Sequence, residues 1–431
     1  MEEKQTQVRE TLTQKPKRKF RFCPDRNMFA FMGSGLIVSV AYMDPGNWGT
    51  AISGGAEFAY DLLWVVWMAS GMAMLFQYLS GKLGIAGYSL PELVKEKLGK
   101  KWLVMFYWIL AEIVIIATDL AEFLGIVVAL NMLFGIPLLW GAYIAIADVL
   151  LILLLTTKRF RILEYSFIIF VGVIGLAYVY EIFVTNPDYS LILLHSVKPI
   201  LTKESALIAV GIIGATVMPH ALFVHSWLVK NKMKNPAFKN KKKTLKYHVW
   251  DNVLSLIIAG FINAAIIIMA AAAFHSSGIA VTTLNQAYTT LIPLFGKFAA
   301  LAFALALLSA GISSSVTGTL AGQSVMDGLT GFKIPLWVRR VITRVINVIP
   351  VTIAILMGIE PLKILILSQV ALSLLIPLPL IPLIMYTADK KIMKELVNRK
   401  ITTIFAVIFA FVILCFNVYL LYQVIFGGAG F

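Results

Sequence analysis

The stretch 41-AYMDPGNWGT-50 decides the fold class, because it interrupts an apolar run in which a membrane-spanning helix is expected. It places a carboxylate, a helix breaker, a flexible residue and a carboxamide in a row, at Asp44, Pro45, Gly46 and Asn47. Proline removes a helical hydrogen bond and glycine lets the backbone turn, so nearby carbonyl oxygens lose their amide partners. An unpaired carboxylate at that depth costs at least about 2.5 kcal/mol, which a bound cation would offset. The alternative is a structural kink in which a neighbouring helix satisfies Asp44.

The composition indicates a polytopic membrane protein. Of the 431 residues, 59% are hydrophobic and only 14% are charged, far fewer charged residues than a soluble domain carries. Apolar runs of about 18 or more residues recur along the chain and predict helices rather than a barrel. We predict eleven spans, at 29–54, 62–86, 102–133, 138–156, 162–184, 204–229, 250–274, 292–323, 336–357, 361–386 and 401–426.

The distribution of charge predicts the orientation in the membrane. Although the formal net charge is +15, the basic residues gather in loops between spans, so we exclude nucleic-acid binding. Basic segments follow every even-numbered span, at 95–101, 158–161, 230–246, 333–340 and 390–400. Together with the basic tail they predict a cytoplasmic amino terminus and an extracellular carboxyl terminus in the cell membrane. The tail has no apolar core of a signal peptide, and Cys23 and Cys415 lie too far apart in the sequence to suggest a disulfide framework.

A second interrupted span suggests an internal repeat. The stretch 211-GIIGATVMPHALFVHS-226 in span six also carries a proline in mid-span, as span one does. Two five-span repeats would be inverted relative to each other, and interrupted spans at equivalent positions point to a transporter site at the repeat interface. The predicted organisation is a cytoplasmic tail (1–28), a first repeat (29–184), an extracellular loop (185–203), a second repeat (204–386), a cytoplasmic loop (387–400) and an accessory helix (401–431).

Span six supplies two candidate metal ligands. Pro219 has no amide hydrogen, so the carbonyl of Ala215 is free to bind an ion. Met218 offers a thioether; a single methionine in a span usually serves packing, but facing Asp44 it would be a soft ligand. Sulfur disfavours Mg²⁺ and Ca²⁺ and admits Mn²⁺, Fe²⁺, Co²⁺, Zn²⁺ and Cd²⁺. Polar residues that could complete the coordination, or simply join helices, are Gln77, Thr118, Asn263, Ser368 and Gln369.

Span three carries a row of acids that predicts proton transfer. Glu112, Asp119 and Glu122 are spaced by seven and three residues, so they share one helix face. Such a row is typical of a proton relay, with Arg344 of span nine as a counter-charge. The alternative is a static ion-pair network, and Asp148 in span four favours neither reading. We assign the preceding pair, Arg339 and Arg340, to the basic membrane face.

Two histidines in span six receive different expectations. His220 lies two residues after Met218, and an imidazole there would suit proton exchange. His225 is interpreted as an interior histidine with satisfied hydrogen bonds.

The Asp-Pro-Gly-Asn of span one and the Ala-Thr-Val-Met-Pro-His of span six resemble the Nramp (natural resistance-associated macrophage protein) family of divalent metal transporters. The resemblance covers nearly the whole chain, including ATDLAEFLG, INAAIIIMAAAAFH, SSSVTGTLAGQ and LSQVALSL. It implies an all-α membrane fold of the LeuT type, with two inverted five-helix repeats, an eleventh helix and broken helices 1 and 6. It also implies import of Mn²⁺ and Fe²⁺ into the cytoplasm, commonly with protons.

The resemblance assigns roles residue by residue. It implies metal binding by Asp44, Asn47, the carbonyl of Ala215 and Met218, with Gln369 as a further ligand in an occluded state. It implies proton handling by Asp44, Asp119, Glu122, His220 and Arg344. The chain departs from common family patterns at Ala221, Ile312, Thr343 and Leu375, which bears on occlusion and on the tightness of proton coupling.

We therefore expect a proton-coupled secondary transporter whose partners are divalent metal ions, protons and the lipid bilayer, with no resident cofactor and no obligate protein partner. Two alternatives stay open: an amino-acid carrier of the same fold, and a membrane metal sensor that binds without transport. Asp44 disfavours the first because it would repel a substrate carboxylate. An enzyme is not expected, since the sequence has no HExxH, no nucleophile elbow and no glycine-rich phosphate loop.

Overall fold

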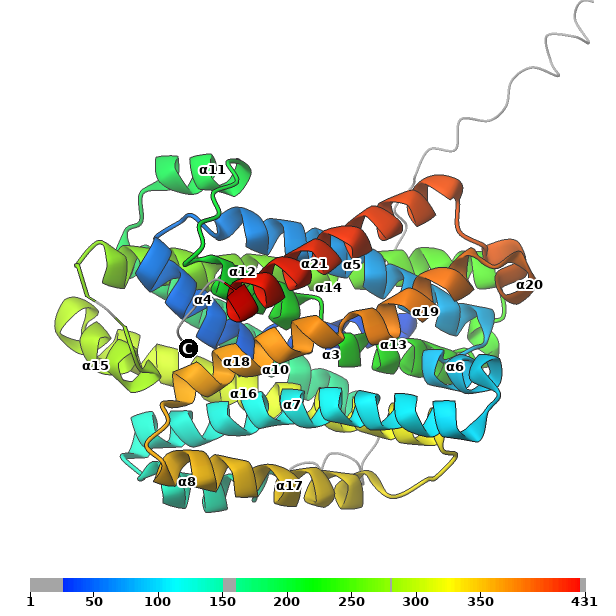
Figure 1. Cartoon of the computed structure of the whole chain (residues 1–431), viewed down its shortest axis with the longest axis horizontal. Helices are drawn as coiled ribbons and strands as arrows, with labels where there is room; N and C mark the ends of the chain where they lie inside the picture. Colours follow the sequence, from blue (N-terminus) through cyan, green and yellow to red (C-terminus); the bar gives the residue numbers. More distant parts are fainter. Residues whose placement is uncertain (1–25, 150–159, 280, 427–431) are drawn as a thin grey trace, which may run out of the picture.

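The computed structural model describes residues 26–149, 160–279 and 281–426, and this part of the chain is helical without any strand (Figure 1). The long helices lie side by side, with α6 and α20 at one end of the molecule and α11 and α15 at the other (Figure 1). Most of the predicted tail, Cys23, residues 150–159 of the span-four region and residues 427–431 lie outside the described ranges.

The first half of the chain contains three short helices, α2, α3 and α4, in place of the predicted first span. Its elements are α2 (Arg26–Phe31), α3 (Ser34–Ala41), α4 (Pro45–Phe58), α5 (Leu63–Ala86), α6 (Leu90–Leu98), α7 (Lys101–Phe134), α8 (Leu138–Ala145), α10 (Phe160–Thr185) and α11 (Tyr189–Val197). The interruption between α3 and α4 falls where the proline and glycine predict it.

The second half shows the same kind of break between α12 and α13. Its elements are α12 (Ala206–Thr216), α13 (Pro219–Lys232), η1 (Pro236–Phe238), α14 (Lys241–Ala270), the π-helical turn η2 (Ala271–His275), α15 (Leu284–Phe295), α16 (Lys297–Leu329), α17 (Leu336–Leu356), α18 (Pro361–Leu375), α19 (Pro377–Ala388), α20 (Lys390–Met393), η3 (Lys394–Leu396) and α21 (Lys400–Phe426).

Two spans predicted as continuous are divided in the structure. Span ten, predicted at 361–386, separates into α18 and α19 because Pro377 cannot continue the helical hydrogen bonding. The predicted start of span eight at 292 falls inside the separate helix α15, which ends at Phe295 and is followed by Gly296. This glycine has φ 91°, a left-handed conformation that favours glycine and lets the chain change direction before α16.

Within the described residues, eight helices are long and apolar enough to cross a membrane. The predicted first span is missing from this set because it is divided into three short helices, and the ninth because α17 carries three arginines. The fourth runs into residues 150–159, outside the described ranges. The count of eleven spans therefore stays a prediction.

The start of α3 is held by a carboxylate from α14. Asp251 accepts hydrogen bonds from the backbone nitrogens of Gly33 (3.1 Å) and Gly35 (2.8 Å) and from the hydroxyl of Ser34 (3.0 Å). The first amide groups of a helix have no partner within the helix, and a buried carboxylate satisfies them well. This contact fixes α3, and with it the interruption that follows at Asp44.

Candidate metal-binding site

The site begins with Asp44, which caps α4. Its Oδ1 accepts a hydrogen bond from the backbone nitrogen of Asn47 at 2.9 Å, and Pro45 occupies the first helical position, where its missing amide hydrogen costs nothing. Asp44 is fully buried, and its second oxygen, Oδ2, has no hydrogen-bond partner. The local sequence thus produces a helix start that presents a free carboxylate oxygen inside the protein.

Asn47 joins the two interrupted helices. Its side-chain nitrogen donates to Asp44 Oδ1 and to the carbonyl oxygen of Ala215, each at 2.9 Å. Its side-chain oxygen accepts from the hydroxyl of Thr216 (3.3 Å) and, at 3.4 Å, from the amide of Asn263. Polar groups from α4, α12 and α14 therefore meet around one carboxamide.

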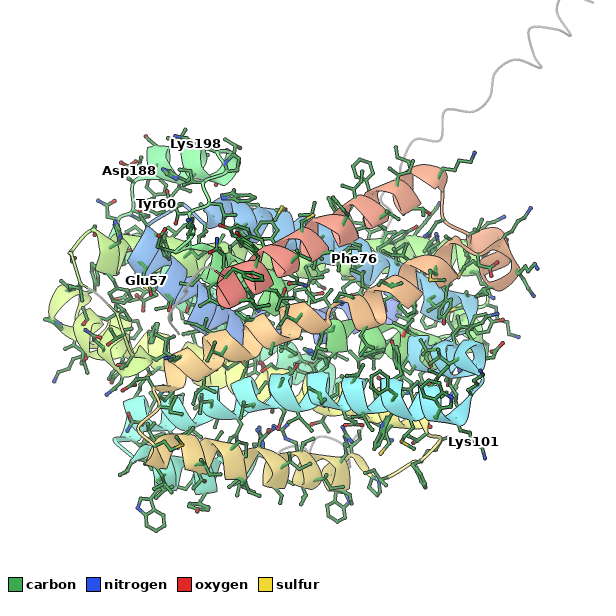
Figure 2. The ribbon with its side chains drawn as sticks, in the orientation of Figure 1. Glu57, Tyr60, Phe76, Lys101, Asp188 and Lys198 are labelled. Carbon is green, nitrogen blue, oxygen red and sulfur yellow. The ribbon has the colours of Figure 1, made fainter. Side chains whose placement is uncertain are left out.

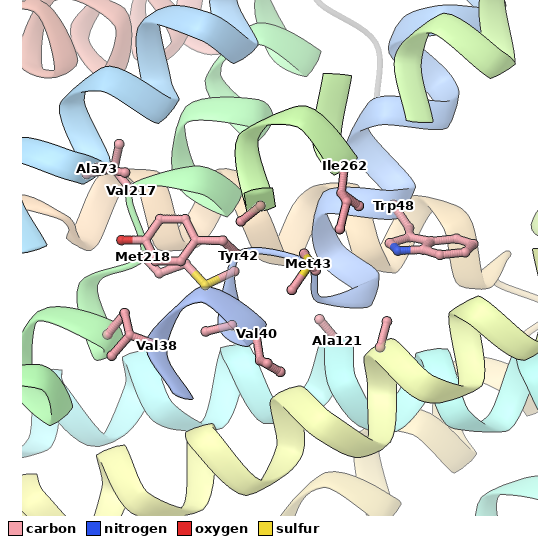
Figure 3. Close-up of a cluster of buried hydrophobic side chains, with 14 of the residues drawn as sticks. Val38, Val40, Tyr42, Met43, Trp48, Ala73, Ala121, Val217, Met218 and Ile262 are labelled. Atoms are coloured by element: carbon pink, nitrogen blue, oxygen red, sulfur yellow. The ribbon is translucent and has the colours of Figure 1, made fainter. Parts of the chain in front are cut away.

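The break in span six presents the other predicted ligands. The helix α12 ends at Thr216, and α13 begins at Pro219, which has no amide hydrogen to donate to the carbonyl of Ala215. Met218 lies in the extended link between them and is fully buried. Figure 3 shows its side chain in the buried cluster that also contains Tyr42 and Met43, directly before Asp44.

Gln369 of α18 reaches the same region. A Cβ added to Gly46 would collide with the carboxamide of Gln369 and would lie 2.9 Å from Oδ2 of Asp44. The side-chain oxygen of Gln369 is buried without a partner, while its nitrogen donates to the hydroxyl of Ser368 at 3.2 Å. The structure thus brings Asp44, Asn47, the Ala215 carbonyl and Gln369 together, with Met218 at the adjoining break.

The two histidines of α13 contact different helices. His220 Nδ1 lies 3.1 Å from the hydroxyl of Thr118 on α7, and its Nε2 has no partner. His225 Nδ1 lies 2.8 Å from the side-chain oxygen of Gln77, whose nitrogen in turn donates to the hydroxyl of Tyr42 at 2.9 Å. Both imidazoles are fully buried, and the Nε2 of His225 also lacks a partner, so the expectation of satisfied hydrogen bonds is wrong for this nitrogen.

The predicted row of acids on α7 is held by arginines of α17. Asp119 pairs with Arg340, accepts from Asn347 at 2.6 Å and lies 3.4 Å from Arg344. Asp148 pairs with both arginines, and the Nε of Arg344 donates to it at 3.1 Å. Two carboxylates and two guanidinium groups therefore form one buried network.

Sequence reasoning misplaced two arginines of α17. Arg339 and Arg340 are assigned above to the basic membrane face, but both are buried: Arg339 pairs with Glu112, and Arg340 with Asp119 and Asp148. Arg340 and Arg344 are four residues apart and share a face of α17. This four-residue spacing is the feature of the sequence that could have indicated Arg340 as a second counter-charge beside Arg344.

Glu122 differs from its neighbours on α7. It is fully buried, and neither carboxylate oxygen has a hydrogen-bond partner. A Cβ on Gly318 of α16 would lie 2.8 Å from its Oε2, so the glycine leaves room for this carboxyl group. An unpaired acid of this kind is suited to gain or lose a proton.

Comparison with known proteins decides the family. Residues 35–423 match the family model described as "Natural resistance-associated macrophage protein-like". The chain belongs to the Nramp family. It is 42% identical over 405 residues to a protein of Deinococcus radiodurans named "Divalent metal cation transporter MntH", covering 94% of this chain and 92% of the relative.

Solved structures agree with the Nramp assignment. A variant of the manganese transporter of Eremococcus coleocola is similar to this chain with a TM-score of 0.83 at 29% identity, covering 96% of this chain and 92% of that one. The nucleobase-cation-symport transporter Mhp1 shares the fold at a TM-score of 0.55 and 13% identity, over 90% of this chain and 88% of the other. The predicted family and the all-helical LeuT-type fold are confirmed, and Nramp relatives named as transporters agree with the expectation that the chain is not an enzyme.

Proposed function

We propose that this chain is a secondary transporter that imports Mn²⁺, and also Fe²⁺, into the cytoplasm together with protons. The proposal is carried by the position of Asn47, whose carboxamide bridges the carboxylate of Asp44 and the freed carbonyl of Ala215. Buried oxygen ligands from two interrupted helices can replace the hydration shell of a divalent cation. The printed names of the relatives, a divalent metal cation transporter and a manganese transporter, support this substrate class.

The selectivity follows from the chemistry of the donors. Asp44, Asn47 and the Ala215 carbonyl supply oxygen, with Gln369 as a further oxygen when the ion is occluded. The thioether of Met218 adds a soft ligand that Mg²⁺ and Ca²⁺ bind poorly. The transported metal is the substrate, and the proposal requires no resident cofactor.

Movement of the metal occurs by alternating access, with α3–α4 and α12–α13 carrying the ion between halves that open to opposite sides. With the amino terminus in the cytoplasm, an inside-negative potential of 100 mV favours entry of a dication by about 4–5 kcal/mol. Protons pass through Asp44, His220, Glu122 and Asp119, with Glu112 and the arginines of α17 as neighbouring charges. The unpartnered oxygens of Glu122 support a protonation step beside the paired network.

The experiment is uptake of Mn²⁺, Fe²⁺, Cd²⁺, Ca²⁺ and Mg²⁺ into proteoliposomes that contain the full chain, with internal pH followed at the same time. We expect Mn²⁺, Fe²⁺ and Cd²⁺ to enter and to acidify the lumen, and Asp44→Asn to abolish both signals. Mn²⁺ binding without any flux by the wild type would contradict the proposal and favour a sensor.

A further inference from the structure

We propose that Glu181 of α10 binds the divalent cation on its way from the outer face of the molecule to Asp44. This inference rests on the proposed function and adds a second cation-binding carboxylate to it.

The first observation is the isolation of this carboxyl group. Glu181 is fully buried, and both of its oxygens lack a hydrogen-bond partner. Among the acidic residues that the structure describes, only Glu122 and Glu181 have both carboxylate oxygens buried and unpartnered. Glu122 lies beside the network described above, whereas the candidate site leaves Glu181 without a role. A buried carboxyl group without a hydrogen-bond partner in a membrane span indicates a functional role rather than a packing role.

The second observation is that the polar neighbours of Glu181 lead toward the metal site. Tyr178 precedes Glu181 by three residues and shares its face of α10, and its buried hydroxyl has no partner. The ring of Tyr178 packs edge-on against the indole of Trp48, with 5.2 Å between the centroids. Trp48 directly follows Asn47, and its indole nitrogen is also buried and unpartnered. Tyr178 and Trp48, two residues in contact that both hold unsatisfied polar atoms, therefore connect Glu181 to the site.

The third observation lies in the opposite direction. Thr185 follows Glu181 by four residues on the same helix face and lines a cavity of about 450 Å³. The cavity opens at the end of the molecule that carries α11, where Figure 2 labels Tyr60 and Asp188. His195 and His275 also line it, and His195 pairs with Asp61 at 3.0 Å. Asp188 also lines this opening, and its carboxylate would attract divalent cations.

These three observations place Glu181 between a cation-attracting cavity and the metal site. The face of α10 that carries Glu181 extends over about two turns, from Thr185, which lines the cavity, to Tyr178, which contacts Trp48. No arginine or lysine pairs with Glu181 in the described part of the chain, so its charge is not committed to a static salt bridge. The carboxylate and the hydroxyls of Tyr178 and Thr185 are hard oxygen donors, which suit a partly hydrated divalent ion.

The test is Mn²⁺ uptake by the full chain in proteoliposomes, comparing the wild type with Glu181→Gln. The substitution keeps the shape of the side chain and removes the charge. We expect the KM for Mn²⁺ to rise about 10-fold, while the maximal rate stays within about 2-fold. Glu204→Gln is the matched control, because it removes one negative charge from an exposed position before α12 and should leave KM unchanged.

Two results would overturn the inference: an unchanged KM in Glu181→Gln, or a change in proton uptake with metal KM unaffected. If the Gln variant does not fold, Glu181→Asp should fold and raise KM by a smaller factor, and an unchanged KM there would count equally against the inference. A second measurement is Mn²⁺ binding to Asp44→Ala protein, where weak residual binding should disappear on adding Glu181→Gln. A wild type that transports no metal would refute the proposed function itself, whereas normal transport by Glu181→Gln refutes only this inference.

Discussion

The side-chain nitrogen of Asn47 lies 2.9 Å from the carbonyl oxygen of Ala215, although the two residues belong to interrupted helices in different halves of the chain. The same nitrogen lies 2.9 Å from Oδ1 of Asp44, so two oxygens converge on one donor. Rotation of the carboxamide by about 180° exchanges its nitrogen and oxygen, so that three oxygens would face one another. The proposed cation would lie among these three oxygens, and Met218 is the adjoining residue that offers sulfur instead of oxygen.

Met218→Ala should therefore change selectivity as well as affinity. Loss of the thioether removes the only soft ligand of the proposed set, so we expect the KM for Cd²⁺ and Mn²⁺ to rise about 10-fold and inhibition by Ca²⁺ or Mg²⁺ to strengthen. Competition uptake in proteoliposomes measures both effects. Met43→Ala is the control, because it truncates another fully buried methionine in the same cluster and should lower stability without changing selectivity. Equal selectivity in the two variants would show that the Met218 sulfur serves packing.

Gly46→Ala should disturb the contact between α4 and α18. The added methyl group would collide with the carboxamide of Gln369 and crowd Oδ2 of Asp44, so we expect a stability loss of about 1–3 kcal/mol and at least about 10-fold slower uptake. Thermal unfolding in detergent and Mn²⁺ uptake measure the two losses. Gly71→Ala is the matched control, since a Cβ there meets no atom within 4 Å.

The double variant Gly46→Ala/Gln369→Ala tests whether the collision with Gln369 causes the stability loss of Gly46→Ala. Removing the carboxamide makes room for the methyl group, so the double variant should be more stable than Gly46→Ala alone. If its unfolding temperature is no higher, the collision with Gln369 is not the source of the defect.

Asp251→Ala should destabilise the protein by about 1–2 kcal/mol, because three hydrogen bonds at the start of α3 lose their acceptor. Asp251→Asn keeps one acceptor oxygen, so its unfolding temperature should lie between those of Asp251→Ala and the wild type. Thermal unfolding measures the order of the three proteins. Asp188→Ala is the control, since this residue caps the exposed helix α11 and its removal should cost less. Equal unfolding temperatures for Asp251→Ala and the wild type would contradict the proposed capping role.

The sequence predicts the interruptions of the spans because their causes are local. Pro45 and Pro219 each lack an amide hydrogen, so the breaks at Asp44 and around Met218 follow from a few adjacent residues. Pro377 divides span ten for the same reason, although the long apolar run around it favours a single helix.

The ion-pair partners of a residue often lie on another helix, far away in the sequence, and the sequence alone does not identify them. Spacing places Asp119 and Glu122 on one face of α7, but it does not show which guanidinium group faces them. Arg340 has the same sequence context as a basic residue at a membrane surface, and only the packing of α17 on α7 reveals it as the partner of Asp119. The isolation of Glu181 is likewise invisible in the sequence, because a lack of partners depends on every neighbouring helix.

Asp119→Asn should reduce proton movement more than metal movement. The substitution removes a charge from the buried network while Arg340 keeps its pairing with Asp148, so the helices stay connected. We expect about 10-fold less lumenal acidification per Mn²⁺ transported, measured by simultaneous metal uptake and internal pH in proteoliposomes.

Asp148→Asn is the matched control: it also removes a carboxylate shared by Arg340 and Arg344 and should lower stability similarly, by up to about 3–5 kcal/mol. Because Asp148 is outside the proposed proton route, its variant should keep the wild-type ratio of protons to metal. An equal loss of both fluxes in Asp119→Asn, matched by Asp148→Asn, would show that the network is a static connection between α7, α17 and the span-four segment.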